Sequence, residues 1–119
     1  MTLLSGSLLA IIEEAGESVL TLTEGLEPDE FFNSKITQHE VLRQIRIMTE
    51  TAANIPFEIK HDIAEVDWAG WSMLSMQLKT AGGFERDAVW FAVRSLIPAT
   101  LMWLRVYRKN TPEHFSLVP

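Results

Sequence analysis

The stretch at residues 67–90, DWAGWSMLSMQLKTAGGFERDAVW, decides how this chain folds. Asp67 suits a helix N-cap, because its carboxylate can accept hydrogen bonds from the unpaired amides of the first turn. The Gly82-Gly83 pair favours a helix end, because glycine readily adopts the left-handed backbone that closes a helix. The sequence therefore predicts a helix from Asp67 to about Thr80 and another that begins near Glu85. The apolar side chains that share one face of the first helix are Trp71, Leu74 and Leu78.

Helical spacing of apolar residues continues on both sides of this stretch. It predicts a long helix over residues 3–23, a short helix begun by Pro28, a second long helix from Thr37, and a turn of helix over residues 56–61. Thr-Gln-His-Glu at residues 37–40 has the spacing of a capping box. We therefore expect an all-α fold, an up-and-down bundle of four main helices with one or two short helices. Residues 1–110 should form one domain, and residues 111–119 a tail without periodicity.

The apolar stripes of the two N-terminal long helices should face the core. On the first helix the stripe is Leu4, Leu8, Ile11, Ile12, Ala15, Val19 and Leu22. On the second it is Val41, Leu42, Ile45, Met48, Thr49 and Ala52. Phe31 and Phe32 should hold the short helix against the same core.

The last helix, expected over about residues 85–109, is apolar on nearly every side. One face carries Val89, Val93, Leu96, Ile97, Leu101, Trp103, Leu104 and Tyr107, and the other side shows Ala88, Phe91, Ala99, Met102 and Val106. A helix of this kind is buried nearly all round, and so small a domain has few helices to cover both sides. We expect Phe91, Ala99, Met102 and Val106 to contact a second copy or another protein. The alternative is that the N-terminal apolar segment covers them.

Four short segments carry a resemblance to a known family. They are IPFEIK at 55–60, VDW at 66–68 and DAVW at 87–90, supported by IMTETAAN at 47–54. Their order and spacing resemble the HepT-like proteins of the HEPN group, which are helical, over roughly residues 8–104. The resemblance implies a homodimer whose catalytic cleft lies at or near the two-fold interface. It also implies pairing with a small nucleotidyltransferase in a toxin–antitoxin module.

The residues that this family uses for chemistry are absent here. HepT-like toxins are metal-independent ribonucleases whose motif is Arg, four residues, His, one residue, Tyr. The matching positions hold Ser75, Thr80 and Gly82. An imidazole can move the proton of a ribose hydroxyl and a guanidinium can hold phosphate charge, whereas serine and threonine do neither. We therefore expect no catalytic residue, and Gly82 leaves no tyrosine for a nucleotidyltransferase to modify. Candidates for lining a ligand or partner pocket are Trp68, Trp71, Met76 and Arg94.

Composition narrows the function classes further. The net charge is −6, and the first 59 residues carry ten acidic against three basic side chains, which disfavours RNA binding. The absence of cysteine excludes thiolate metal sites and fits a reducing cytoplasm. His39, His61 and His114 lack metal-ligand spacing, so we expect no metal and no cofactor. The apolar run at residues 95–104 is about half the ~20 residues a spanning helix needs, so no membrane is expected.

Three hypotheses follow. The first is a catalytically silent HepT-like protein that acts through dimerisation or partner binding. The second is an active metal-independent ribonuclease with relocated residues, such as Arg86, Arg94 and His61. The third is a helical bundle that binds a small ligand or nucleotide near Trp68 and Trp71.

Overall fold

The computed structural model describes residues 2–80 and 85–117, and these residues form helices joined by short connections, with no strand among them. The main elements are α1 (Thr2–Thr23), α3 (Lys35–Asn54), α5 (Trp68–Lys79) and the C-terminal helix, which comprises α6 (Glu85–Phe91), a π-helical turn η1 (Ala92–Leu96) and α7 (Ile97–Asn110). Short elements are α2 (Pro28–Phe32), α4 (Phe57–Asp62) and η2 (Pro112–Phe115). The expected all-α bundle of four main helices is confirmed.

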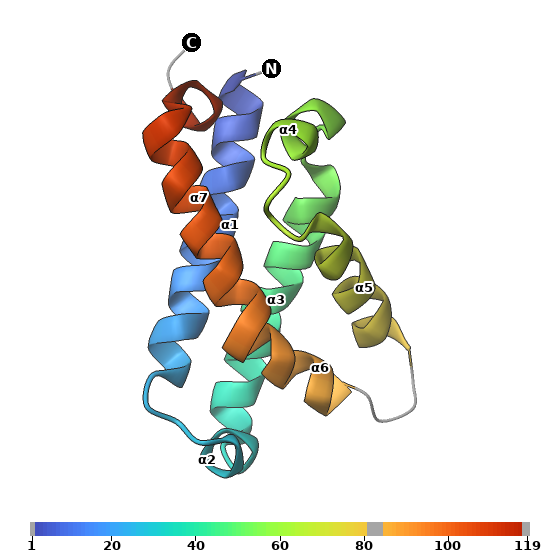
Figure 1. The fold of residues 1–119 in the computed structure, drawn as a ribbon. Helices are drawn as coiled ribbons and strands as arrows, with labels where there is room; N and C mark the ends of the chain where they lie inside the picture. Colours follow the sequence, from blue (N-terminus) through green and yellow to red (C-terminus); the bar gives the residue numbers. More distant parts are fainter. Residues whose placement is uncertain (1, 81–84, 118–119) are drawn as a thin grey trace.

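The helices form two layers, with α1 and α3 behind and the C-terminal helix and α5 in front (Figure 1). The principal extents of 45 × 28 × 20 Å describe a slab two helices thick. The two ends of the chain lie at the same end of the bundle (Figure 1). Core side chains come from both layers, and the largest that are fully buried are Trp71, Phe31, Leu9, Ile12, Ile45, Met48, Ile63, Leu74, Ile97 and Leu104.

The apolar stripe of α3 packs as predicted, whereas that of α1 is narrower. Ile12, Ala15 and Val19 are buried, and Leu9, which the prediction omitted, is fully buried. Leu4, Ile11 and Leu22 are exposed by 56%, 40% and 36%. The reason is geometric: α1 packs on α3 and the C-terminal helix over a limited arc, so the flank of its stripe faces solvent.

The N-terminus of α3 differs from the prediction. Ser34 caps the helix, and its hydroxyl oxygen accepts a hydrogen bond from the Thr37 amide at 3.4 Å. Thr37 is therefore inside the helix, and its own hydroxyl accepts from Ser34 Oγ at 2.8 Å. Glu40, the supposed partner in a capping box, instead accepts hydrogen bonds from Arg43 and Gln44. A capping serine three residues upstream displaced the predicted start.

Pro28 and Asp67 open α2 and α5 as predicted, and a capping box that was not predicted adds to the start of α2. Pro28 opens α2, Glu27 and Glu30 form a capping box, and Phe31 is fully buried. Asp67 caps α5, and its Oδ1 accepts a hydrogen bond from the Gly70 amide at 2.8 Å. A side chain at Gly70 would place its Cβ only 2.4 Å from Asp67 Oδ2, so the glycine permits this close approach. The predicted glycine stop at residues 82–83 lies outside the described residues.

The C-terminal helix contains a wide turn that explains its apolar pattern. Its buried residues recur at steps of four: Ala88, Ala92, Leu96, Thr100 and Leu104, and Val89, Val93, Ile97 and Leu101. A regular α-helix of 3.6 residues per turn would rotate these series away from the core. In η1 the Ile97 amide bonds to the carbonyl of Ala92, five residues back, and the extra residue restores a single buried face. Pro98, which has no amide hydrogen to donate, follows this turn in the first positions of α7.

The same turn corrects one residue of the side of the C-terminal helix that was expected to face away from the core. Ala88 belongs to the buried face and is only 6% exposed. Phe91, Ala99, Met102 and Val106 remain exposed, and α1 does not fold over them. Beyond the helix, residues 111–117 pack on the bundle, because Phe115 of η2 is buried against α1 and α7.

The helical segment Glu85–Asn110 is long and apolar enough, by length and composition, to cross a membrane. A core helix of a globular bundle passes the same test, since it too must bury an apolar face. Within the apolar window of this segment, 44% of the residues are buried inside the molecule. In this fold the segment is a core helix with one side exposed to solvent.

Candidate functional site

Ser75, one of the three positions singled out by the resemblance, lies in the wall of a hollow between α3 and α5. Its volume is about 180 Å³. The residues that line it are Thr49, Ala52, Ala53, Lys60, Trp68, Trp71, Ser72, Ser75 and Met76. Three of the four predicted pocket residues, Trp68, Trp71 and Met76, are therefore together. Pockets for drug-sized ligands usually span ~300 Å³ or more, so this hollow suits a side chain or a small group.

Both tryptophans of the hollow already use their polar atoms within the fold. Trp71 is buried, and its Nε1 donates a hydrogen bond to Thr100 Oγ1 of α7 at 2.9 Å. Trp68 Nε1 donates to the carbonyl of Ile63 at 3.0 Å. The Lys60 ammonium lies 5.7 Å from the centre of the Trp68 ring, at cation–π distance. The indoles thus hold the walls in place and leave only apolar surface for a ligand.

The chemistry of the hollow rests on hydroxyls and one ammonium. Ser75 is partly buried in its wall. Thr80 does not belong to this lining; it caps the C-terminal end of α5, where its hydroxyl donates to the Met76 carbonyl at 2.8 Å. Gly82 lies outside the described residues. Among the described residues that line the hollow, none is a histidine or an arginine, and Lys60 supplies its cation. Such a set can attract a small anion but offers no proton shuttle near neutral pH.

Arg94 does not join the other predicted pocket residues. Its guanidinium donates to the Leu26 carbonyl at 3.3 Å and lies 4.8 Å from the centre of the Trp90 ring. It lines a separate hollow with Thr23, Glu24 and other residues at the C-terminal end of α1. Arg94 lies within the π-helical turn of the C-terminal helix, a turn that was not predicted from the sequence.

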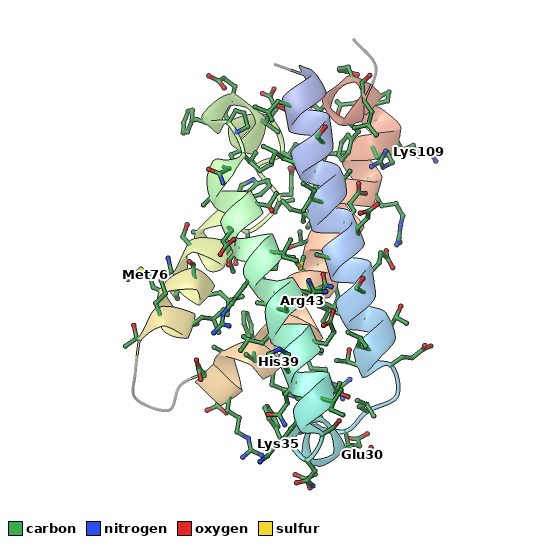
Figure 2. The ribbon with its side chains drawn as sticks, turned by 180° about the vertical axis from the view of Figure 1, so that it is seen from behind. Glu30, Lys35, His39, Arg43, Met76 and Lys109 are labelled. Atoms are coloured by element: carbon green, nitrogen blue, oxygen red, sulfur yellow. The ribbon has the colours of Figure 1, made fainter. Side chains whose placement is uncertain are left out.

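The relocated ribonuclease residues do not converge. Arg86 stacks on Phe32, with its guanidinium carbon 4.2 Å from the ring centre. His61 stacks on Phe57 in α4, at the opposite end of the bundle from α6 (Figure 1). His39 lies on the outer side of α3 (Figure 2), and His114 Nε2 lies 3.4 Å from Asp62 Oδ2. Over residues 2–80 and 85–117, no group of three or more His, Asp or Glu side chains has the arrangement of a metal site.

A third hollow, of about 210 Å³, lies between α2, α3 and α6, and the sequence did not predict it. Phe31, Phe32, Leu42 and Val89 form its apolar lining, and Gln38, Glu85 and Arg86 supply its polar groups. The Gln38 amide donates to the carbonyls of Phe32 and Ser34. Tertiary packing brings these elements together, so no local spacing in the sequence could have indicated it.

Comparison with known proteins gives one distant relative. An 88-residue segment is 28% identical to a protein of Methanocaldococcus jannaschii named "Gamma-glutamylcyclotransferase and putative RNase". The match covers 73% of this chain and 40% of that protein, so the chain spans well under half of its relative. No protein-family model and no solved structure matches the chain. The chain is therefore distantly similar to a protein whose name includes a ribonuclease.

Proposed function

We propose that this chain is a HepT-like helical protein of ribonuclease ancestry that acts by binding protein partners and cleaves no RNA. The observation that carries the proposal is the hollow between α3 and α5, whose wall holds Ser75 where the resemblance places the family's arginine. Thr80, at the C-terminal end of α5, stands where the resemblance places the histidine. Proton transfer by a positioned side chain contributes about 10²–10⁴-fold to rate. Hydroxyl side chains supply none of it at neutral pH.

The relative's printed name supports the ribonuclease ancestry, and the helical bundle is compatible with it. The partners we propose are a second copy of the chain and a small nucleotidyltransferase in the cytoplasm. Tyrosine is absent from position 82, so the nucleotidyltransferase would bind this protein without modifying it there. Co-expression with a nucleotidyltransferase encoded beside it, followed by co-purification, tests that pairing.

The direct test is an RNA-cleavage assay with the purified chain in excess chelator. We expect no cleavage above the buffer rate in the fractions that contain the protein. Lys60→Ala removes the cation of the hollow, and Arg94→Ala is its matched control because Arg94 lies in a different hollow. Cleavage that co-elutes with the protein and is lost in Lys60→Ala, but kept in Arg94→Ala, would refute the proposal.

The small-ligand hypothesis receives less support from the same hollow. Its volume is small, and both indole N–H groups already have partners. We expect mono- and dinucleotides to leave the melting temperature of the protein unchanged in a thermal-shift series. A concentration-dependent rise that disappears in Lys60→Ala would instead assign the hollow to an anionic ligand.

A further inference from the structure

The solvent-facing flank of α1 carries apolar side chains that the core does not cover. Leu4 is 56% exposed, Ile11 40% and Leu22 36%. They belong to a series that steps alternately by four and three residues: Leu4, Leu8, Ile11, Ala15, Ser18 and Leu22. An average step of 3.5 residues is the spacing at which one helix packs along another. These six residues are called the α1 seam below.

The α1 seam borders α3, which lies beside α1 in the same layer (Figure 2). A shallow hollow of about 400 Å³ opens where the two helices meet. The residues that line it are Ser18 and Leu22 of the seam, Glu17 and Thr21 of α1, and Glu40 and Gln44 of α3. From Leu4 to Leu22 the seam is about 27 Å long, which is room for about five turns of a second helix.

The charges beside the seam are mainly acidic. The charged side chains of α1 are Glu13, Glu14 and Glu17, and this helix contains no lysine or arginine. Glu13 forms an ion pair with Arg108 of α7. Glu14 and Glu17 are exposed, and neither has an ion-pair partner among the residues that the structure describes. The rim of the seam on α1 is therefore negatively charged.

The basic side chains of α3 offset little of this charge. Arg43 lies 2.6 Å from Glu40, so that pair is close to neutral. His39 and Arg46 line a separate hollow. At 100° per residue, Lys35, His39 and Arg46 all lie on the side of α3 turned away from Gln44, and so away from the seam. A partner at the seam thus meets an apolar stripe with a net negative border.

We propose that the α1 seam binds a basic amphipathic helix of another protein. Apolar residues of that helix, at steps of three and four, cover Leu4, Ile11 and Leu22. Lysine or arginine residues beside its apolar stripe lie near Glu14 and Glu17, where opposite charges favour this partner over an acidic one. The proposal rests on the proposed function only in taking the binding of other proteins as the way the chain acts.

The middle of the seam suits a close approach. Ala15 and Ser18 have small side chains, so the axis of a second helix can come within about 8–10 Å of the axis of α1. Nucleic acid and anionic bilayers carry the same sign of charge as Glu14 and Glu17, so both are repelled from this side. The charge therefore selects a basic protein segment.

A pair of synthetic peptides tests the partner chemistry. Each is a helix of three heptads with leucine at the a and d positions, and the e and g positions carry lysine in one peptide and glutamate in the other. We expect fluorescence anisotropy to show that the lysine peptide binds about tenfold more tightly or better. Ile11→Ser combined with Leu22→Ser should weaken its binding about fivefold or more, and both side chains are already exposed, so the fold is kept.

A charge reversal separates the seam from the overall charge of the chain. Glu14→Lys combined with Glu17→Lys should weaken the lysine peptide about tenfold and strengthen the glutamate peptide by a similar factor. A destabilised fold would not give this inverted preference. The matched control is Glu85→Lys combined with Asp87→Lys, which changes the net charge equally on exposed positions of α6 in the other layer. It should alter both dissociation constants by less than about twofold.

The remaining outcomes overturn the proposal. Equal affinity for the two peptides, no binding of the lysine peptide, or an equal effect of the α6 control would each do so. Weaker self-association of the chain in the Ile11→Ser and Leu22→Ser variant would assign the seam to a second copy instead. The proposed function fails on a different result, namely RNA cleavage that depends on Lys60, so the two failures are distinguishable.

Discussion

Both layers of this molecule present apolar side chains to the core, but their solvent-facing outer sides differ. On α3 the outer side carries Lys35, His39, Arg43, Arg46 and Glu50, and Figure 2 shows its labelled members along the helix. On the C-terminal helix the outer side carries Phe91, Ala99, Met102 and Val106. Both helices belong to one small domain, so domain size cannot explain the contrast.

The outer side of α3 is charged, whereas the outer side of the C-terminal helix is apolar. Exposed charges need no further contact, whereas an exposed apolar face lowers its free energy only by leaving water. The hollow between α3 and α5 belongs to neither outer side. Its two indole N–H groups donate hydrogen bonds within the protein, and its hydroxyls do not transfer protons near neutral pH.

The largest effect should follow from a change on the inner side. Trp71→Ala removes a buried ring and its hydrogen bond to Thr100, which ties α5 to α7. We expect a loss of about 3–5 kcal/mol in the free energy of unfolding, measured by urea denaturation. Met76→Ala, an exposed residue of the same helix, is the control and should change stability by less than about 0.5 kcal/mol. Similar costs for the two would mean that α5 is not held by Trp71.

The next effect separates association from folding. Phe91→Asp combined with Met102→Asp places charges on the outer side of the C-terminal helix, where both side chains are already exposed. We expect the dissociation constant of the dimer to rise about a hundredfold or more, measured by sedimentation equilibrium. The urea midpoint of the monomer should stay nearly unchanged. Arg46→Asp on the outer side of α3 should leave the dissociation constant of the dimer unchanged. Weaker association in this variant would contradict the contrast between the two outer sides.

A smaller effect concerns the contact between α7 and the connection from α4 to α5. Tyr107 donates a hydrogen bond to the Glu65 carboxylate, which raises the pKa of Tyr107 above its ordinary 10.0. The folded pKa is the higher one, so this contribution to stability is present below pH 10 and is lost as the pH rises through it. Tyr107 is the chain's one tyrosine, so ultraviolet absorbance follows it alone. Glu65→Ala should bring the pKa down toward 10, and an unchanged titration would argue against the bond.

The smallest effect belongs to the charged outer side. Hydrogen bonds from Arg43 and Gln44 lower the pKa of Glu40 from 4.5 to about 2. The folded pKa is the lower one, so the stabilisation is present above pH 4.5 and is lost as the pH falls toward 2. In Arg43→Ala the Glu40 pKa should rise toward its ordinary value, as followed by NMR. A pKa that stays near 2 in this variant would show that Arg43 is not its cause.

The sequence predicted the helices and several caps because those signals are local. Asp67 needs only its own first turn, and the stripe of α3 needs only regular spacing. The errors arose where a nearby alternative or a tertiary contact decided the outcome. Ser34 offered an earlier cap than Thr37, and Leu4 and Ile11 continued a stripe beyond the arc that packing covers.

The candidate site could be predicted in part for the same reason. Trp68, Trp71 and Met76 lie on one short helix, so their proximity followed from helical spacing. Arg94 comes from another helix, where it lies within the π-turn and donates to the Leu26 carbonyl. The signal for that turn was present, because the apolar residues from Ala88 to Leu104 recur at steps of four, which a regular helix cannot keep on one face.

Amide hydrogen–deuterium exchange at increasing protein concentration tests the central claim most directly, because it reads both outer sides in one sample. Raising the concentration about a hundredfold should favour the dimer by mass action. The account predicts slower exchange in peptides that cover residues 91–106, with exchange over residues 35–50 unchanged. Protection of residues 35–50, with residues 91–106 unaffected, would contradict it.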